Sequence, residues 1–194
     1  MDTKFSTPLK AVVGMRLSSV SYWILDGDLD DFAVDEPNLS GGCQSVTMWF
    51  GQRILEISWG SDKDLVAEHL GYAYHIAISS TSKLEDRPDL RSLGSASLRK
   101  IPADRSYLWQ SVLGRPLKQV HILGINQSPQ AIELVFPDNK IIVCIGDTNR
   151  DSKISDGDEV LIFGEPEWKK AVATQSFFVE GFQTLQQVSS SNVC

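Results

Sequence analysis

The sequence predicts an α+β fold that is mainly antiparallel β-sheet, with few short helices. Short runs in which apolar and polar residues alternate are separated by Gly, Pro, Asn and Asp, a pattern typical of strands joined by turns. The stretch 131–163 contains two strand-like runs around a tight turn, then an acidic loop and a third run. A weaker copy of this hairpin lies upstream at 46–59.

In the first half of the chain, two short helices and four strands are expected. Thr7 and Pro8 resemble an N-cap followed by Pro at the first helical position, and Gly14 ends the helical turn. A second helix is expected to begin at Ser61 and to end at Gly71. The expected strands are 17–25, 46–50, 54–59 and 74–79.

In the second half, the hairpin 131–145 has the clearest pattern. Ile132, Leu134 and Phe136 lie two residues apart, as in a strand with one buried face. Residues 141–145 form a continuous apolar run, which predicts a strand that is buried on both faces. The other elements expected here are a short helix at 107–113 and strands at 120–125, 160–163 and 176–182.

The two halves share spacing as well as pattern. The apolar and glycine positions 12–20 recur 100 residues later, and those of the hairpin 46–59 recur 86 residues later. The difference between these displacements fits an insertion in the first half, at the acidic stretch 26–42. We therefore expect one domain, built from two similar helix–strand–hairpin units that pack together. The domain would span 1–183, with units at about 7–79 and 107–182, a connection at 80–105 and a flexible tail at 184–194.

Composition and charge argue against several classes of function. The chain has 194 residues and a net charge of −7, so nucleic acid is not an expected partner, because phosphate binding needs clustered Lys and Arg. No apolar run has the length of a membrane span, and the N-terminus lacks the apolar core of a signal peptide. The three cysteines are too widely spaced for a disulfide framework or a CxxC metal site. The expected compartment is a reducing cytoplasm.

The loop after Ile145 contains a candidate calcium site. Side chains with oxygen atoms stand at positions 1, 3, 5, 9 and 12 of a pattern that resembles the DxNxDGxIxxxD loop of EF-hand and dockerin modules. Position 6 is Ser152 where those loops have Gly, and the loop follows a strand. The alternative is a solvated loop that turns at Asp156 and Gly157. The candidate ligands are Asp147, Asn149, Asp151, Ser155 and Asp158.

The acidic stretch DGDLDDFAVDE at 26–36, the first in chain order, has six acidic residues and no basic one. A negative surface of this kind attracts a basic protein and speeds its association. The alternative is a solvated loop without a partner. The candidate partner-binding residues are Asp26, Asp28, Asp30, Asp31, Asp35 and Glu36.

No local motif in the sequence indicates an enzyme. The three histidines, His69, His75 and His121, are scattered, and the GxSxG, HExxH, P-loop and GxGxxG patterns are absent. No catalytic residue and no cofactor are therefore expected, apart from the candidate calcium ion. An active site assembled from distant residues is an alternative, and it would need a pocket in which a histidine meets a carboxylate.

The second hairpin and the strand after it resemble a known family. Alternating apolar residues up to Phe136, then Asp138, Asn139 and Lys140, and the later run DEVLIF at 158–163 are similar to small acidic bacterial immunity proteins of polymorphic or contact-dependent toxin systems. The first hairpin is similar. The resemblance implies a cytosolic, non-catalytic protein that binds a toxin domain and blocks its active site. Such families share no fixed catalytic set, so it assigns no residue roles. The expected function is binding of a basic protein, with a calcium-binding module and an enzyme as alternatives.

Overall fold

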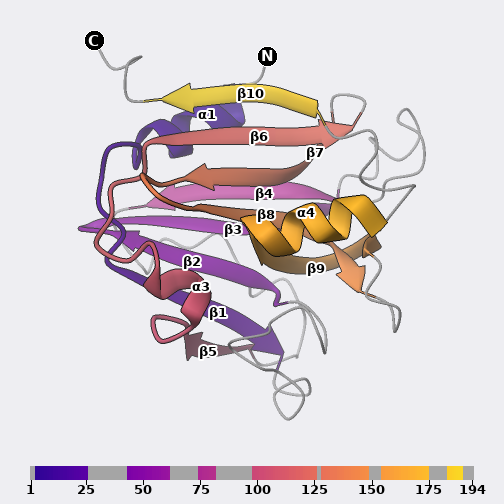
Figure 1. Cartoon of the computed structure of the whole chain (residues 1–194), viewed down its shortest axis with the longest axis horizontal. Helices are drawn as coiled ribbons and strands as arrows, with labels where there is room; N and C mark the ends of the chain where they lie inside the picture. Colours follow the sequence, from indigo (N-terminus) through magenta and orange to yellow (C-terminus); the bar gives the residue numbers. More distant parts are fainter. Residues whose placement is uncertain are drawn as a thin grey trace.

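The computed structural model describes residues 3–25, 43–61, 74–81, 98–125, 128–148, 154–174 and 183–189. These residues form two five-stranded sheets and three short helices (Figure 1). Neighbouring strands in both sheets are antiparallel. The expected class, mainly antiparallel β-sheet with few short helices, is confirmed.

The first sheet has the strand order β4-β3-β2-β1-β5. Helix α1 (Thr3–Lys10) precedes its first strand in the chain. The strands expected at 17–25, 46–50, 54–59 and 74–79 are confirmed as β1 to β4. The bounds are β1 Ser19–Leu25, β2 Ser45–Phe50, β3 Arg53–Ser61, β4 Tyr74–Thr81 and β5 Leu98–Pro102.

The second sheet has the strand order β10-β6-β7-β8-β9. Helix α3 (Tyr107–Gln110) precedes it, and helix α4 (Glu165–Thr174) follows β9. The expected hairpin is confirmed as β7 and β8, whereas β9 takes in residues 154–158 that were expected in the acidic loop. The bounds are β6 Gln119–Ile125, β7 Ser128–Val135, β8 Lys140–Thr148, β9 Ile154–Gly164 and β10 Gln183–Ser189.

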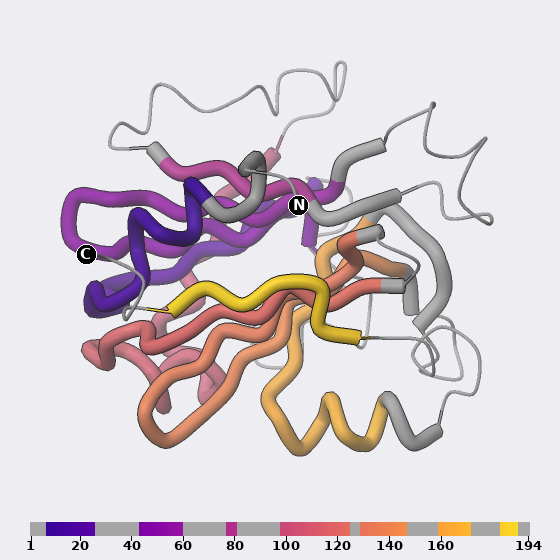
Figure 2. The backbone as a smooth tube through the Cα atoms, turned by 90° about the horizontal axis from the view of Figure 1, so that it is seen from above, coloured from indigo at the N-terminus to yellow at the C-terminus, as the bar shows by residue number. Residues whose placement is uncertain are grey.

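The two sheets form two layers that share one hydrophobic core (Figure 2). Successive side chains of a strand lie on opposite faces, so every second residue points into this core. In β2, Val46, Met48 and Phe50 are fully buried, while Trp49 is half-buried on the outer face, as its position in the alternation predicts.

Helix α4 covers part of the outer face of the second sheet (Figure 1). Trp168 of α4 packs against Phe163 of β9, with 5.6 Å between the ring centroids. Residues 141–146 of β8 are all buried, which confirms the prediction made from their continuous apolar run. The buried residues of this outer cluster are Ala131, Ile142, Cys144, Leu161 and Phe163.

Two tight turns, one from each half of the chain, contact each other reciprocally. The Gly14 N–H donates to the Leu117 carbonyl oxygen at 2.7 Å, and the Gly114 N–H donates to the Leu17 carbonyl oxygen at 2.7 Å. Both glycines have positive φ angles, 88° for Gly14 and 74° for Gly114. Residues with a Cβ atom rarely adopt this conformation, so glycine is required at both turns.

The structure differs from the expected elements in three places. The expected connection 80–105 contains β5, which pairs with β1. The expected tail 184–194 contains most of β10, which pairs with β6 and buries Val188. Helix α1 begins at Thr3, so Pro8 lies inside it. Both missed strands pair with a single neighbour at the end of a sheet, where backbone hydrogen bonding holds a strand without regular apolar alternation.

The remaining expected elements fall outside the described residues. These are the helix after Ser61, the strand 176–182 and the end of the tail, 190–194. Ser61 itself is the last residue of β3.

Candidate functional site

The structure describes the residues on either side of the first acidic stretch, Leu25 and Cys43. Its carboxylates, from Asp26 to Glu36, lie outside the described residues, which resume at Cys43. The Cys43 N–H donates to the Val160 carbonyl oxygen at 3.1 Å, and the Val160 N–H donates back to the Cys43 carbonyl oxygen at 2.7 Å. Val160 belongs to β9, so the chain returns from this stretch by pairing with the second sheet.

Further contacts fix the position of this return. The Gln44 N–H donates to the Trp23 carbonyl oxygen at 2.7 Å, and Trp59 Nε1 donates to Gln44 Oε1 at 3.0 Å. Cys43 is fully buried, and burial raises the pKa of its thiol, with a smaller contribution from the negative charge of Glu159. The thiol is therefore neutral, and Cys43 acts here as a packed residue that pairs with β9, while the adjacent Gln44 contacts β1 and β3.

The second acidic stretch extends the β8–β9 hairpin. Asp147 lies in β8 and is paired across the ladder with Ser155 of β9, while Asp158 lies three residues further along β9. Asn149 and Asp151 lie outside the described residues. The candidate calcium loop thus begins and ends in strands, whereas the loops it resembles adjoin helices. Among the described residues, no group of three or more His, Cys, Asp or Glu side chains could hold a metal ion.

Described residues that border the two acidic stretches pair with each other. Residues 154–159 of β9 belong to the second stretch, and Val160, the next residue, pairs with Cys43, which follows the first stretch by seven residues. Stretches 26–36 and 147–159 contain eleven of the chain's 25 acidic residues. Acidic residues concentrated in this way along a chain produce a negative potential that attracts positively charged groups. We refer to the two stretches, with the Cys43–Val160 pair that borders them, as the acidic end.

The structure also brings a histidine and a carboxylate together on the outer face of the second sheet. His121 Nδ1 lies 2.5 Å from Glu133 Oε2, and Lys140 Nζ donates to Glu133 Oε1 at 2.9 Å. The hydrogen bond to Glu133 raises the pKa of Lys140. The three side chains come from β6, β7 and β8, so the cluster links three neighbouring strands.

This cluster contains the residue types that general acid–base catalysis uses. A catalytic histidine also needs a substrate held within hydrogen-bond reach. A groove lined by described residues is formed by α1, β3 and β4, and none of the three side chains takes part in it. The hydrogen bonds among these three side chains account for the cluster as an ion network that stabilises the sheet. His69 and the side chain of His75 lie outside the described residues.

The outer face of the first sheet carries a polar network that sequence reasoning missed. Trp23 Nε1 donates to Thr47 Oγ1 at 3.0 Å, and the Ser45 hydroxyl donates to Glu56 Oε1 at 3.1 Å. Glu56 is only 6% exposed, which is unusual for a carboxylate. In the sequence, this network is indicated by small polar residues that alternate with the core residues of β1 and β2. Trp49 lies on the same face, with the Lys100 ammonium 4.2 Å from its ring centroid.

Comparison with known proteins adds no family to these observations. No protein-family model matches the chain, and no match was found among curated proteins or solved structures. Within the part of the chain that the structure describes, no helix is long and apolar enough to cross a membrane.

Proposed function

We propose that the protein is a non-catalytic cytoplasmic binding protein that captures a basic protein partner at its acidic end. The observation that carries this proposal is the pair of hydrogen bonds between Cys43 and Val160, two described residues that border the two acidic stretches. Carboxylates gathered on one surface accelerate association with a cationic surface and favour it over other partners. Cys43 and Cys144 are buried and form no disulfide, as is typical of a reducing compartment.

The length of the first acidic connection supports this proposal. The second sheet joins β6 to β7 with two residues, whereas the first sheet joins β1 to β2 with nineteen. A two-residue turn is therefore sufficient for this position of the fold. The seventeen additional residues, which include six carboxylates, are not needed to close a hairpin, and we attribute them to binding.

We also propose that the two halves are copies of one duplicated unit. The order β4-β3-β2-β1-β5 becomes β9-β8-β7-β6-β10 when each strand number is raised by five. The registers agree as well, since Val20 pairs with Met48 and Val120 pairs with Leu134. The reciprocal hydrogen bonds of the two glycine turns add a third agreement. On this proposal the acidic connection is an insertion in the first copy.

A partner of the toxin class follows from the resemblance to immunity proteins. Such a partner would present a cationic active-site surface, which the acidic end would cover. The experiment combines the purified chain with the product of the adjacent gene in its genome and measures the association rate at several salt concentrations. We expect the triple variant Asp28→Asn, Asp30→Asn and Asp31→Asn to associate about tenfold more slowly and with a weaker salt dependence.

A matched control separates a local effect from the change in net charge. The variant Asp138→Asn, Glu165→Gln and Glu167→Gln removes the same number of charges, from the β7–β8 turn and helix α4. It is expected to associate at nearly the wild-type rate. Equal slowing in both triple variants would reject the acidic end as the binding surface, and absence of any complex with the wild-type chain would reject the toxin partner.

The calcium-binding alternative has an inexpensive test. A ligand that binds only the folded state raises the melting temperature. A calcium-dependent rise at millimolar concentration that Asp151→Asn removes would establish the calcium loop. Identical melting in calcium and in chelator would eliminate it.

A further inference from the structure

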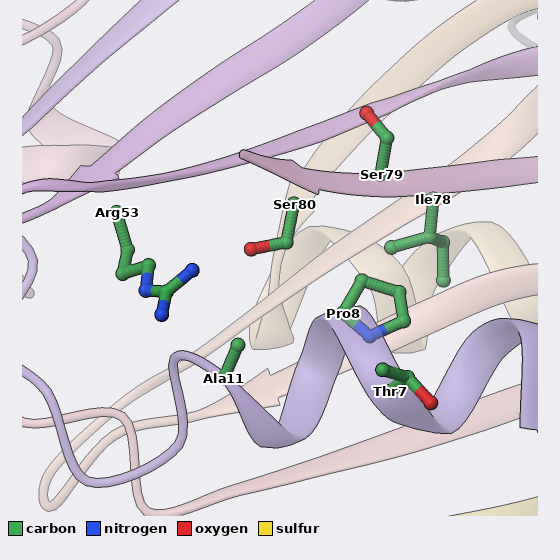
Figure 3. Close-up of a pocket in the computed structure, with 7 residues that line it drawn as sticks. All are labelled: Thr7, Pro8, Ala11, Arg53, Ile78, Ser79 and Ser80. Carbon is green, nitrogen blue, oxygen red and sulfur yellow. The ribbon is translucent and has the colours of Figure 1, made fainter. Parts of the chain in front are cut away.

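A groove of about 500 Å³ lies between helix α1 and strands β3 and β4 of the first sheet (Figure 3). This volume is within the range of small-molecule binding sites. Helix α1 and the turn after it form one wall, and the two strands form the other. The groove is lined by Thr7, Pro8, Ala11, Arg53, Ile78, Ser79 and Ser80.

Arg53 is the single charged residue among the seven that line the groove. Its guanidinium group makes no hydrogen bond or ion pair with any residue that the structure describes. A guanidinium offers five N–H donors in a planar arrangement that matches the two oxygens of a carboxylate or phosphate group. Arg53 is exposed, so these donors are accessible to an oxyanion that enters the groove.

Ser80 supplies a second unused donor. Its hydroxyl oxygen is buried and has no hydrogen-bond partner among the residues that the structure describes. Buried hydroxyl groups are nearly always paired, because an unpaired one loses its hydrogen bonds to water and gains nothing in return. The Ser80 hydroxyl and the Arg53 guanidinium are turned toward the same space beside Ala11 (Figure 3).

The matching corner of the second half is closed by direct contacts. Asn139, which stands 86 residues after Arg53, donates from Nδ2 to the Ser111 hydroxyl at 2.9 Å. In the ladder, Gly164 takes the place of Ser80, and a Cβ atom on Gly164 would lie 3.2 Å from Leu108 Cδ2. The first half has Ala11 where the second has Ser111, so Arg53 has no such partner. The same backbone arrangement is thus closed in one half and open in the other.

The groove and the Cys43–Val160 pair lie at opposite ends of β2. Cys43 lies two residues before β2, Arg53 begins β3 after the turn that follows β2, and the six residues of β2 span about 20 Å. A charge beside Cys43 is therefore about two Debye lengths from Arg53 at physiological salt, and its effect there is largely screened. Lys10, the exposed residue directly before Ala11 at the end of α1, adds a positive charge next to the groove lining.

We propose that this groove binds a small organic anion. Its oxyanion group accepts hydrogen bonds from Arg53 and from the Ser80 hydroxyl, and its aliphatic part lies against Pro8, Ala11 and Ile78. The apolar walls favour a short-chain carboxylate over inorganic phosphate, which shares only the oxyanion group. This site is independent of the protein-binding role proposed above, since it involves neither acidic stretch.

The test titrates the full chain with sodium butyrate and, separately, with sodium phosphate, at constant ionic strength. Amide NMR shifts of the residues that line the groove report binding. We expect saturable binding of butyrate that Arg53→Gln weakens about tenfold or more, because a hydrogen-bonded charge is lost. Arg115→Gln removes an exposed arginine outside the groove lining and is expected to leave binding unchanged.

Ser80→Ala supplies a second, independent readout. It is expected to weaken butyrate binding and also to raise the melting temperature of the unliganded protein, because it removes an unpaired buried hydroxyl. A lower melting temperature would show that the hydroxyl supports the fold, and would overturn its assignment to a ligand. Saturable phosphate binding with the same variant pattern would keep the oxyanion site and assign it to phosphate. Absence of saturation with both anions, or equal weakening in Arg53→Gln and Arg115→Gln, would overturn the proposal.

Discussion

Replacing Tyr22 with Phe tests whether the two halves are joined by a specific polar contact inside the common core. Tyr22 lies in β1 and Trp109 in α3, 87 residues apart in the chain, and both are fully buried. Trp109 Nε1 donates to the Tyr22 hydroxyl at 2.6 Å. The variant Tyr22→Phe keeps the ring and removes the acceptor, which leaves the indole N–H unpaired.

The expected cost follows from the loss of this acceptor. A buried donor that loses its partner destabilises a protein by about 1–3 kcal/mol. We therefore expect Tyr22→Phe to lower the free energy of unfolding by about 2 kcal/mol, or the melting temperature by about 4–8 °C for a chain of this size. Chemical denaturation with fluorescence detection measures the first quantity, and calorimetry measures the second.

A double-mutant cycle isolates the hydrogen bond from other effects of each substitution. Trp109→Phe removes the donor, and the combined variant removes both partners. The losses of unfolding free energy in the two single variants should add up to about 1 kcal/mol or more above the loss in the double variant. The reason is that the double variant no longer contains a buried donor without an acceptor. Strictly additive costs would refute the reasoning, since they would mean that the two side chains do not act on each other.

Three further predictions concern the turns, the ion network and the thiols. Gly14→Ala is expected to cost about 1–2 kcal/mol through backbone strain alone, because no atom lies within 4 Å of the added Cβ; Gly14→Asn, measured in the same denaturation assay, should cost less. Glu133 raises the pKa of Lys140, so this stabilisation is fully present below the unfolded pKa of Lys, about 10.4, and is lost as pH rises through the higher folded pKa. The free energy of unfolding should be measured between about pH 9 and 12, the range in which Lys titrates. It should fall less with rising pH in Glu133→Gln than in the wild-type chain. Burial raises the pKa of the Cys43 and Cys144 thiols, so in a Cys194→Ser variant a thiol reagent should label neither until denaturant is added.

The sequence predicted the strands whose burial depends on their own alternation. The hairpins β2–β3 and β7–β8 are of this kind, because each buries every second side chain and turns over a few residues. Strands β5 and β10 were missed because each is defined by hydrogen bonds to one neighbouring strand. Their sequences, LRKIP and QTLQQVS, lack a regular apolar alternation and so do not indicate this pairing.

The sites were harder to predict than the strands, because each depends on contacts between distant residues. The acidic residues could be seen in the sequence, but the pair of residues that borders the two stretches links Cys43 to Val160, 117 positions away. The hairpin 46–59, which contains Arg53, was predicted, whereas the unpaired hydroxyl of Ser80 is a property of packing around β4. The meeting of His121 with Glu133 follows from the register of β6 against β7, which no local pattern specifies.

Differences between the two halves are informative because their strand order and registers agree. A residue needed only to maintain this architecture could be the same in both halves, so a polar group present at one position and absent at its counterpart calls for another reason. Arg53 beside Ala11 faces a groove, while Asn139 beside Ser111 closes the equivalent corner with a hydrogen bond. The long acidic connection has a two-residue counterpart. Both departures lie at the ends of strands, where the core imposes the fewest constraints, and both change charge while the apolar packing beneath them is retained. The two proposed sites are therefore best tested by making one half resemble the other: replacing Arg53 with Asn, or shortening the acidic connection, should remove one binding activity while leaving the fold intact.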